Sequence, residues 1–161
     1  MNIDQKFVLI TGVAGFIGAA VAKRFILEGH KVLGIDNFCD YYDIELKKNR
    51  ILDIEKELGN KNNLWNFKNL SIENYEELKK VTEKESPDII INLAAQAGVR
   101  YSLSNPMDCI KTNLLGFANI LEICRLRKVE HLVYASSSSV YGGNKLSPFK
   151  EHHSVDHPVS L

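Results

Sequence analysis

The chain is poor in the features that mark secreted, membrane-spanning and nucleic-acid-binding proteins. Its 161 residues hold three cysteines, Cys39, Cys109 and Cys124, and this odd number without paired spacing favours reduced thiols over disulfides. No apolar run reaches the length of a membrane span, and the run 7–10 is shorter than a signal-peptide core. Twenty acidic residues cancel twenty basic ones, so no net field attracts nucleic acid or an anionic membrane. We expect a cytoplasmic protein with neither partner.

Apolar residues make up 45% of the chain, enough for the core of about one domain at this length. Short β-branched runs alternate with longer stretches of helical period, which is typical of an α/β fold. We predict strands over 7–10, 31–36, 64–68, 88–93 and 131–135. We predict helices over 16–28, 43–58 (with Gly59 as its stop), 72–84 and 106–128, and a loop from 142 onward. This order indicates a Rossmann-type doubly wound parallel sheet.

Three glycines follow the first predicted strand and open the first predicted helix. Gly12 permits a tight turn, Gly15 lets backbone N–H groups approach a pyrophosphate, and Gly18 lets the helix pack close to the sheet. The free N–H groups of a helix N-terminus also favour phosphate. A structural turn of small residues is the alternative. The agreement of strand, turn, helix and a downstream acid favours a dinucleotide site instead.

The downstream acid is Asp36, at the end of the second predicted strand. A carboxylate at this position accepts hydrogen bonds from a ribose diol. It also repels a 2′-phosphate, because two charges about 4 Å apart cost roughly 4 kcal/mol at an effective dielectric near 20. No Arg or Lys occurs in the next ten residues to offset that repulsion. The sequence therefore predicts NAD rather than NADP as the cofactor, with a solvated turn Asp beside Asn37 as the alternative.

Four segments together resemble one known family. They are Gly12-x-x-Gly15-x-x-Gly18, Asn92-Leu-Ala-Ala-Gln-Ala-Gly-Val-Arg100, Asn113-Leu-Leu-Gly116 and Ala135-Ser-Ser-Ser-Ser-Val-Tyr-Gly142. In this order they are similar to the extended short-chain dehydrogenase/reductase family, the NAD-dependent epimerases and dehydratases. Within it, the segments 35–43, 94–103 and 151–158 are most similar to UDP-glucuronate 4-epimerases. The resemblance covers the whole chain but only the N-terminal half of such an enzyme.

The resemblance implies a role for each matching residue. Those along the dinucleotide pyrophosphate would be Gly12, Gly15, Phe16, Ile17 and Gly18. Those at the adenosine and nicotinamide ends would be Asp36, Asn37, Asn69, Leu70, Leu93, Ala94 and Ala95, with Thr112 and Asn113 behind the cofactor. One position departs from the family pattern, because Asn69 stands where the family has Asp before Leu70, which alters the adenine contact.

For catalysis, the resemblance places Ser137 at the family's catalytic Ser/Thr position, with Ser138 and Ser139 as near alternates. Arg100 is a candidate for a sugar carboxylate or diphosphate, with a surface ion pair as the alternative. We predict no metal site, because His152, His153 and His157 match no closed ligand set.

The family's general base is a Tyr-x-x-x-Lys pair, which by this resemblance falls at or just past Leu161. We therefore expect residues 1–161 to be the NAD-binding part alone, without a substrate domain and inactive in isolation. A second chain carrying the C-terminal half could restore turnover of a UDP-sugar. Two alternatives remain: a non-catalytic dinucleotide-binding module or truncated-gene remnant, and a fragment of a UDP-sugar decarboxylase or 4,6-dehydratase.

Overall fold

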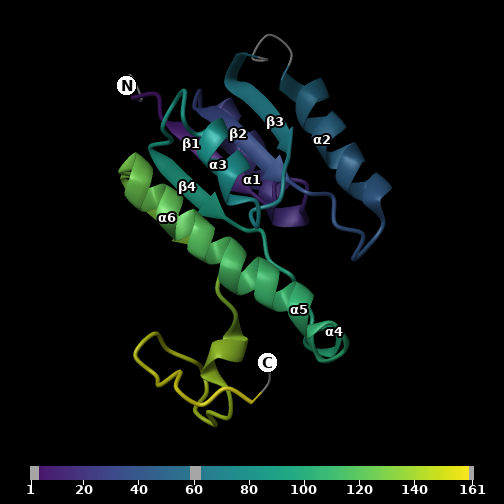
Figure 1. Cartoon of the computed structure of the whole chain (residues 1–161), viewed down its shortest axis with the longest axis vertical. Helices are drawn as coiled ribbons and strands as arrows, with labels where there is room; N and C mark the ends of the chain where they lie inside the picture. Colours follow the sequence, from purple (N-terminus) through teal and green to yellow (C-terminus); the bar gives the residue numbers. More distant parts are fainter. Residues whose placement is uncertain (1–3, 59–62, 160–161) are drawn as a thin grey trace.

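A five-stranded parallel sheet with helices on both faces forms the centre of the fold (Figure 1). The computed structural model describes residues 4–58 and 63–159. The strands are β1 (Phe7–Thr11), β2 (Lys31–Asp36), β3 (Trp65–Asn69), β4 (Ile89–Asn92) and β5 (His131–Tyr134). The helices are α1 (Phe16–Leu27), α2 (Ile44–Leu58), α3 (Tyr75–Val81), α4 (Val99–Ser104), α5 (Pro106–Cys109), the π-helix η2 (Ile110–Gly116), α6 (Phe117–Arg127) and the 3₁₀ helix η3 (Ser138–Tyr141). The predicted Rossmann-type doubly wound sheet is confirmed.

The strand order places a reversal of chain direction at the middle of the sheet. The order is β3-β2-β1-β4-β5, so the chain builds outward from β1 to one edge and then from β4 to the other. Val8 of β1 pairs with Val32 of β2 on one side and with Ile89 of β4 on the other. In open parallel sheets, ligands bind outside the carboxyl ends of the strands at such a reversal. A ligand site is therefore expected at the carboxyl ends of β1 and β4.

Alternating side chains of the central strands enter two apolar layers. The layer under α1 and α2 includes Val8, Ile10, Ala22, Ile26, Ile51 and Ile54. The layer under α3 and α6 includes Leu9, Leu33, Ile35, Leu78, Ile120 and Ile123. Because both faces are covered there, the central strands β1, β2 and β4 carry continuous apolar runs, whereas the edge strand β3 alternates apolar and polar residues. This two-sided packing fixes the carboxyl edge of the sheet.

The helical run after β4 differs most from the prediction. A single α-helix was expected over 106–128, but its middle seven residues form the π-helix η2. Gly116, at the end of η2, packs so closely that an added Cβ would lie 2.7 Å from the Ile72 side chain. The preceding helix α4 was not predicted at all, because its six residues include Val99, Tyr101 and two serines, which are weak helix formers.

Helix α3 is shorter than the predicted 72–84 because polar side chains mark both of its ends. The Asn74 side chain accepts a hydrogen bond from the Glu77 N–H at 3.2 Å and caps the first turn. The Thr82 hydroxyl donates to the Leu78 carbonyl at 2.9 Å at the other end. Gly59, the predicted stop of α2, lies outside the described residues.

The described chain after residue 142 contains turns and loop, as predicted. Figure 1 shows this segment, in yellow, beyond α6. The Tyr141 ring stacks on the Phe149 ring with centroids 4.5 Å apart, which joins η3 to the loop. None of the helices in the described ranges combines the length and apolar character needed to cross a bilayer.

Candidate functional site

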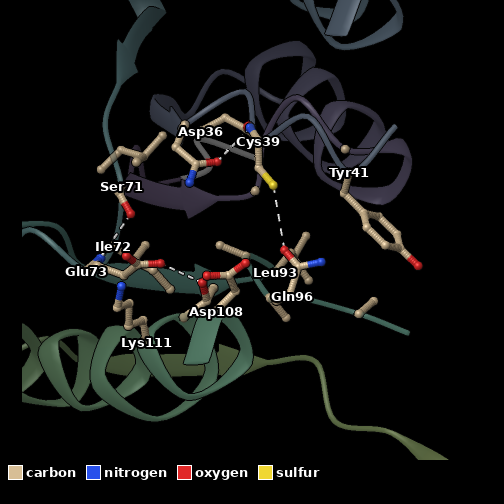
Figure 2. Close-up of a pocket in the computed structure, with 18 of the residues that line it drawn as sticks. Asp36, Cys39, Tyr41, Ser71, Ile72, Glu73, Leu93, Gln96, Asp108 and Lys111 are labelled. Atoms are coloured by element: carbon tan, nitrogen blue, oxygen red, sulfur yellow. Dashed lines mark hydrogen bonds between the residues drawn. The ribbon is translucent and has the colours of Figure 1, made fainter. Parts of the chain in front are cut away.

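A cleft of about 430 Å³ opens at the carboxyl ends of β1, β2 and β4. Its walls come from the loops after the first four strands and from residues of α2, α4, α5 and η2 (Figure 2). Nine of the predicted cofactor residues line it: Gly12, Gly15, Asp36, Asn37, Leu70, Leu93, Ala94, Ala95 and Thr112. The fold thus gathers residues from five separate segments at one cavity. Their roles toward a cofactor stay predictions.

Gly12 is required at the turn after β1 for two separate reasons. Its φ is +67°, a conformation that residues with a Cβ rarely adopt. An added Cβ would also lie 2.7 Å from the backbone nitrogen of Ala94 and 2.8 Å from the carbonyl carbon of Leu93. The glycine therefore lets the loop after β4 lie directly against the loop after β1, which brings both to the same wall of the cleft.

Helix α1 begins at the cleft without a side-chain cap. Its N-cap is Gly15, which has no side chain to accept the first N–H groups, and the first hydrogen bond to its carbonyl comes from Ala19 at 3.1 Å. Phe16 and Ile17 in the first turn are 82% and 61% exposed. The uncapped donors and the partial positive charge of this helix end are suited to an anion.

The Asp36 carboxylate ties the glycine-rich loop to the loop after β2. The residue is buried, its Oδ2 accepts from the Ala14 N–H at 3.0 Å, and its Oδ1 accepts from the Phe38 N–H at 2.9 Å. Each carboxylate oxygen keeps further lone-pair capacity. The Asn37 side chain bonds within its own loop, where its Oδ1 accepts from the Cys39 N–H at 3.0 Å.

Thr11 links the ends of the two central strands, a function that the sequence did not reveal. Its side chain is fully buried, and its hydroxyl donates to Asn92 Oδ1 at 2.7 Å. The same oxygen accepts from the N–H groups of Leu93 at 3.2 Å and Ala94 at 3.1 Å. Three polar groups at the start of the loop after β4 are thereby held in place.

Two neighbouring residues of η2 hold two different loops at the cleft. The Asn113 side chain accepts from the Gln96 N–H and donates to the Gln96 carbonyl, each at 2.9 Å. The Thr112 hydroxyl donates to Glu73 Oε1 at 2.6 Å. Figure 2 shows Glu73 and Gln96 entering from the loops after β3 and β4. Asn113 itself is exposed and does not line the cleft.

Lys47 also lines the cleft, although the sequence did not mark it as a site residue. It is only 7% exposed, and its Nζ donates to the Cys39 carbonyl at 2.6 Å and lies 4.7 Å from the centre of the Tyr42 ring. A signal was present, because Lys47 falls on the same helical stripe as Ile51, Ile54 and Leu58, the buried residues of α2. A lysine on that stripe is a candidate for burial.

Tyr101 and Asp108 form a titratable pair in the cleft wall. The Tyr101 hydroxyl donates to Asp108 Oδ2 at 2.9 Å, and the Tyr101 ring meets the Tyr41 ring edge-on at 5.2 Å. The hydrogen bond to Asp108 raises the pKa of Tyr101 to about 12, with desolvation as the second cause. The phenol therefore stays protonated to a higher pH than an ordinary tyrosine, whose pKa is 10.0.

Several predicted site residues lie outside the cleft lining. Gly18 is buried behind it, where an added Cβ would lie 2.8 Å from the Val13 Cα, and Asn69 is exposed at the end of β3. Ser137, Ser138 and Ser139 are exposed and follow β5, whose end is joined to β4 by a hydrogen bond from the Ala135 N–H to the Asn92 carbonyl at 3.1 Å. Arg100 is exposed on α4.

A second hollow lies in the C-terminal segment and includes His152, His153 and His157. Within residues 4–58 and 63–159, no group of His, Cys, Asp and Glu is arranged to hold a metal ion. The three cysteines are free thiols.

The chain matches known proteins along almost its whole length. A family model described as GDP-mannose 4,6 dehydratase matches residues 9–160. Protein CapI of Staphylococcus aureus is 49% identical over 154 residues, which cover 96% of this chain and 44% of CapI. A probable UDP-glucuronate 4-epimerase of Rhizobium meliloti is 44% identical over 155 residues, with 95% and 43% covered.

A solved structure of an epimerase also matches the fold of this chain. A UDP-glucose-4-epimerase from Stenotrophomonas maltophila, crystallised with NAD and formylated UDP-arabinopyranose, is 25% identical with a TM-score of 0.80. The match covers 93% of this chain and 42% of that one. The chain belongs to the family of the GDP-mannose 4,6-dehydratase model, among the extended short-chain epimerases and dehydratases. It spans less than half the length of each of these three proteins.

Proposed function

We propose that this chain is the dinucleotide-binding unit of an NAD-dependent UDP-sugar 4-epimerase that acts on UDP-glucuronate. The observation that carries the proposal is the cleft at the reversal between β1 and β4, where the uncapped start of α1 and the Asp36 carboxylate lie in one wall. The relative named as a probable UDP-glucuronate 4-epimerase supports the substrate, and the neighbour crystallised with NAD supports the cofactor.

The residues present suit a dinucleotide. Gly12 and Gly15 leave the backbone bare where a pyrophosphate would approach, and the first N–H groups of α1 have no side-chain cap. The Gln96 Nε2, in the cleft wall, is buried without a hydrogen-bond partner among the described residues. An unsatisfied buried donor is a place where a ligand acceptor fits. NAD, when bound, supplies the acceptor for a hydride and returns that hydride.

Different residues of the chain would bind different parts of the dinucleotide. The start of α1 would hold the pyrophosphate through backbone N–H groups, and Asp36 would accept from the adenosine ribose diol with its remaining lone pairs. The loop 93–97, held by Thr11 and Asn113, would shape the pocket for the second ribose. Such preorganisation lowers the entropic cost of ordering the loop on binding.

Ser137 is the proposed hydrogen-bond partner of the sugar hydroxyl. Its Oγ accepts from the Ser139 N–H at 3.1 Å, which leaves the hydroxyl proton free for donation. Two Tyr-x-x-x-Lys strings occur within the chain, Tyr75 to Lys79 and Tyr141 to Lys145, and neither suits the base. Tyr75, the first residue of α3, packs against the core, and Gly142 at φ +53° interrupts the second string. We therefore propose that the base comes from a further segment, in the same or a second polypeptide.

Calorimetric titration with NAD, and with NADP as the control, tests the cofactor assignment. Saturable NAD binding with much weaker NADP binding is the expected result, because the Asp36 carboxylate repels a 2′-phosphate. Absence of NAD binding, or equal affinity for both, would contradict it. An assay for interconversion of UDP-glucuronate and UDP-galacturonate tests the substrate and the source of the base. We expect turnover only when a chain with the Tyr-x-x-x-Lys pair is added to the 161-residue chain.

A non-catalytic dinucleotide-binding module is the second candidate. The exposure of all three candidate serines, outside the cleft lining, favours it. NAD binding without turnover, even with a complementing chain present, would support this candidate over the epimerase. A 4,6-dehydratase is less well supported, because Ser137-Ser-Ser139 stands where the resemblance would place Thr-Asp-Glu.

A further inference from the structure

The glycine-rich loop is held at its centre from two sides. Ala14 is fully buried, and Asp36 Oδ2 accepts from its N–H at 3.0 Å. On the other side, Arg50 Nη1 donates to the Ala14 carbonyl at 3.0 Å. Asp36 thereby fixes the peptide that joins Val13 to Ala14, and Arg50 fixes the peptide that joins Ala14 to Gly15. Arg50 lies on α2, so its contact crosses from one helix to the loop that begins another.

Arg50 is itself held in position by Tyr42. The same Nη1 donates to the Tyr42 hydroxyl at 2.8 Å, and the guanidinium carbon lies 5.6 Å from the centre of the Tyr42 ring. Lys47, three residues earlier on α2, lies over the same ring. Within the described ranges, neither Arg50 nor Lys47 has a carboxylate within ion-pair distance. The positive charge of Arg50 is therefore directed at the loop rather than neutralised by an acid.

We propose that Arg50 is a positioning residue of the dinucleotide site, which orients the glycine-rich loop for a diphosphate. The Ala14 carbonyl shares its peptide plane with the Gly15 N–H, and Gly15 is the N-cap of α1. The Gly15 N–H itself donates to the Gly12 carbonyl at 3.0 Å, so holding the Ala14 carbonyl fixes this turn and with it the direction of the free N–H groups in the first turn of α1. A guanidinium donates a strong, charge-assisted hydrogen bond with fixed geometry. The inference rests on the proposed function and assigns Arg50 no contact with the ligand.

The first test compares ligands that contain and lack the diphosphate. NAD is titrated by calorimetry, and adenosine by NMR shift changes, into the 161-residue chain and its Arg50→Met and Arg50→Lys variants. We expect Arg50→Met to weaken NAD by about tenfold, the value of one hydrogen bond to a charged group. Adenosine affinity should change by less than about twofold, since adenosine makes no diphosphate contact. Arg50→Lys should recover part of the loss, because one charged donor can still reach the Ala14 carbonyl.

A matched control comes from the same helix. Lys48 is exposed and pairs with Glu45 at 2.7 Å, away from the loop, so Lys48→Met should leave NAD affinity unchanged. An NAD affinity of Arg50→Met equal to that of the unmodified chain would overturn the proposal. Equal losses for NAD and adenosine would also overturn it, because a general loss of structure moves both.

A second measurement is independent of any ligand. Amide hydrogen exchange in the free chain should speed up in residues 15–18 of Arg50→Met, with residues 31–36 of β2 unchanged. If Arg50→Met does not fold, Tyr42→Phe replaces it, because that variant keeps the ring and removes only the hydroxyl that holds Nη1. Unchanged exchange at residues 15–18 in the folded variant would overturn the role of Arg50. Failure of the unmodified chain to bind NAD would instead reject the proposed function, and the exchange experiment would then decide the role of Arg50 alone.

Discussion

Asn113 holds the backbone of Gln96 at both of its polar groups, with two hydrogen bonds of 2.9 Å each. The side-chain amide of Asn113 thus supplies the two hydrogen bonds that a neighbouring strand would make if β4 continued to Gln96. Thr112, the residue before it, holds Glu73 of the loop after β3. Two adjacent residues of the π-helix η2 thus contact two different loops of the cleft.

Removal of the Asn113 side chain should therefore increase local opening of the loop after β4 more than it destabilises the whole fold. Two net hydrogen bonds are worth about 1–3 kcal/mol, so we expect Asn113→Ala to lower the free energy of unfolding by about that amount. Urea denaturation measures this loss, and amide exchange should rise selectively over residues 93–98. Asn119 provides a contrast, since its buried Nδ2 donates to the Ile72 carbonyl at 2.9 Å. Asn119→Ala should lower the free energy of unfolding without faster amide exchange at residues 93–98. Equal exchange profiles for the two variants would contradict the role of Asn113 in holding this loop.

Gly12 and Gly29 make a matched pair for testing the turn after β1. Both have positive φ, +67° and +92°, but only at Gly12 would a Cβ collide with neighbouring backbone. Gly29→Ala should cost about 1 kcal/mol of stability, from backbone strain alone. Gly12→Ala should cost several times more and weaken NAD binding, because the loop after β4 must move away. Thermal denaturation and NAD titration of both variants test this, and similar effects at the two positions would show that the close approach has no consequence.

Asp36 should be sensitive even to an isosteric change. Both of its oxygens accept backbone N–H groups, so Asp36→Asn directs an NH₂ group at one of two donors, Ala14 or Phe38. Hydrogen bonds to a charged acceptor are worth about 1.5–3 kcal/mol, and we expect a stability loss in that range. NAD affinity should fall, and the preference for NAD over NADP should narrow because the repelling charge is gone. A variant with unchanged stability and unchanged cofactor preference would remove Asp36 from its proposed role.

Much of the fold followed from the sequence, and the reason lies in the strands. The apolar runs 7–10, 31–36 and 88–93 became β1, β2 and β4 because a sheet covered on both faces needs such runs. The spacing of Gly12, Gly15 and Gly18 located the turn and the start of α1. These features depend on local pattern, which a single sequence displays.

The contacts that join distant segments could not be predicted in the same way. Thr11 and Asn92 are 81 positions apart, and Asn113 and Gln96 are joined through a π-helix that no residue pattern indicates. Arg50 looked like an ordinary charged residue of a solvated helix, and for Lys47 the sequence offered only its place on the apolar stripe of α2. The burial of Lys47 and the contacts of the two side chains with Cys39 and Ala14 depend on how α2 packs in the fold, which is tertiary information.

The pair of Tyr101 and Asp108 provides a prediction about pH. The pKa of Tyr101 is raised from 10.0 to about 12, first by the hydrogen bond to Asp108. The neutral phenol is therefore favoured by folding, so the pair contributes stability fully below about pH 10 and loses it as the pH rises through about 12. Asp108→Asn keeps a neutral acceptor but removes the charge, so the pKa should fall toward 10.0.

Tyrosinate absorbance during a pH titration measures this shift, with Tyr101→Phe used to assign the signal to Tyr101. Asp40→Asn is the matched control, because the Asp40 carboxylate also raises this pKa but acts only through its charge at a distance. We expect a clear downward shift for Asp108→Asn and almost none for Asp40→Asn. Shifts of equal size would mean that the general negative charge of the cleft, rather than the hydrogen bond of 2.9 Å, keeps Tyr101 protonated.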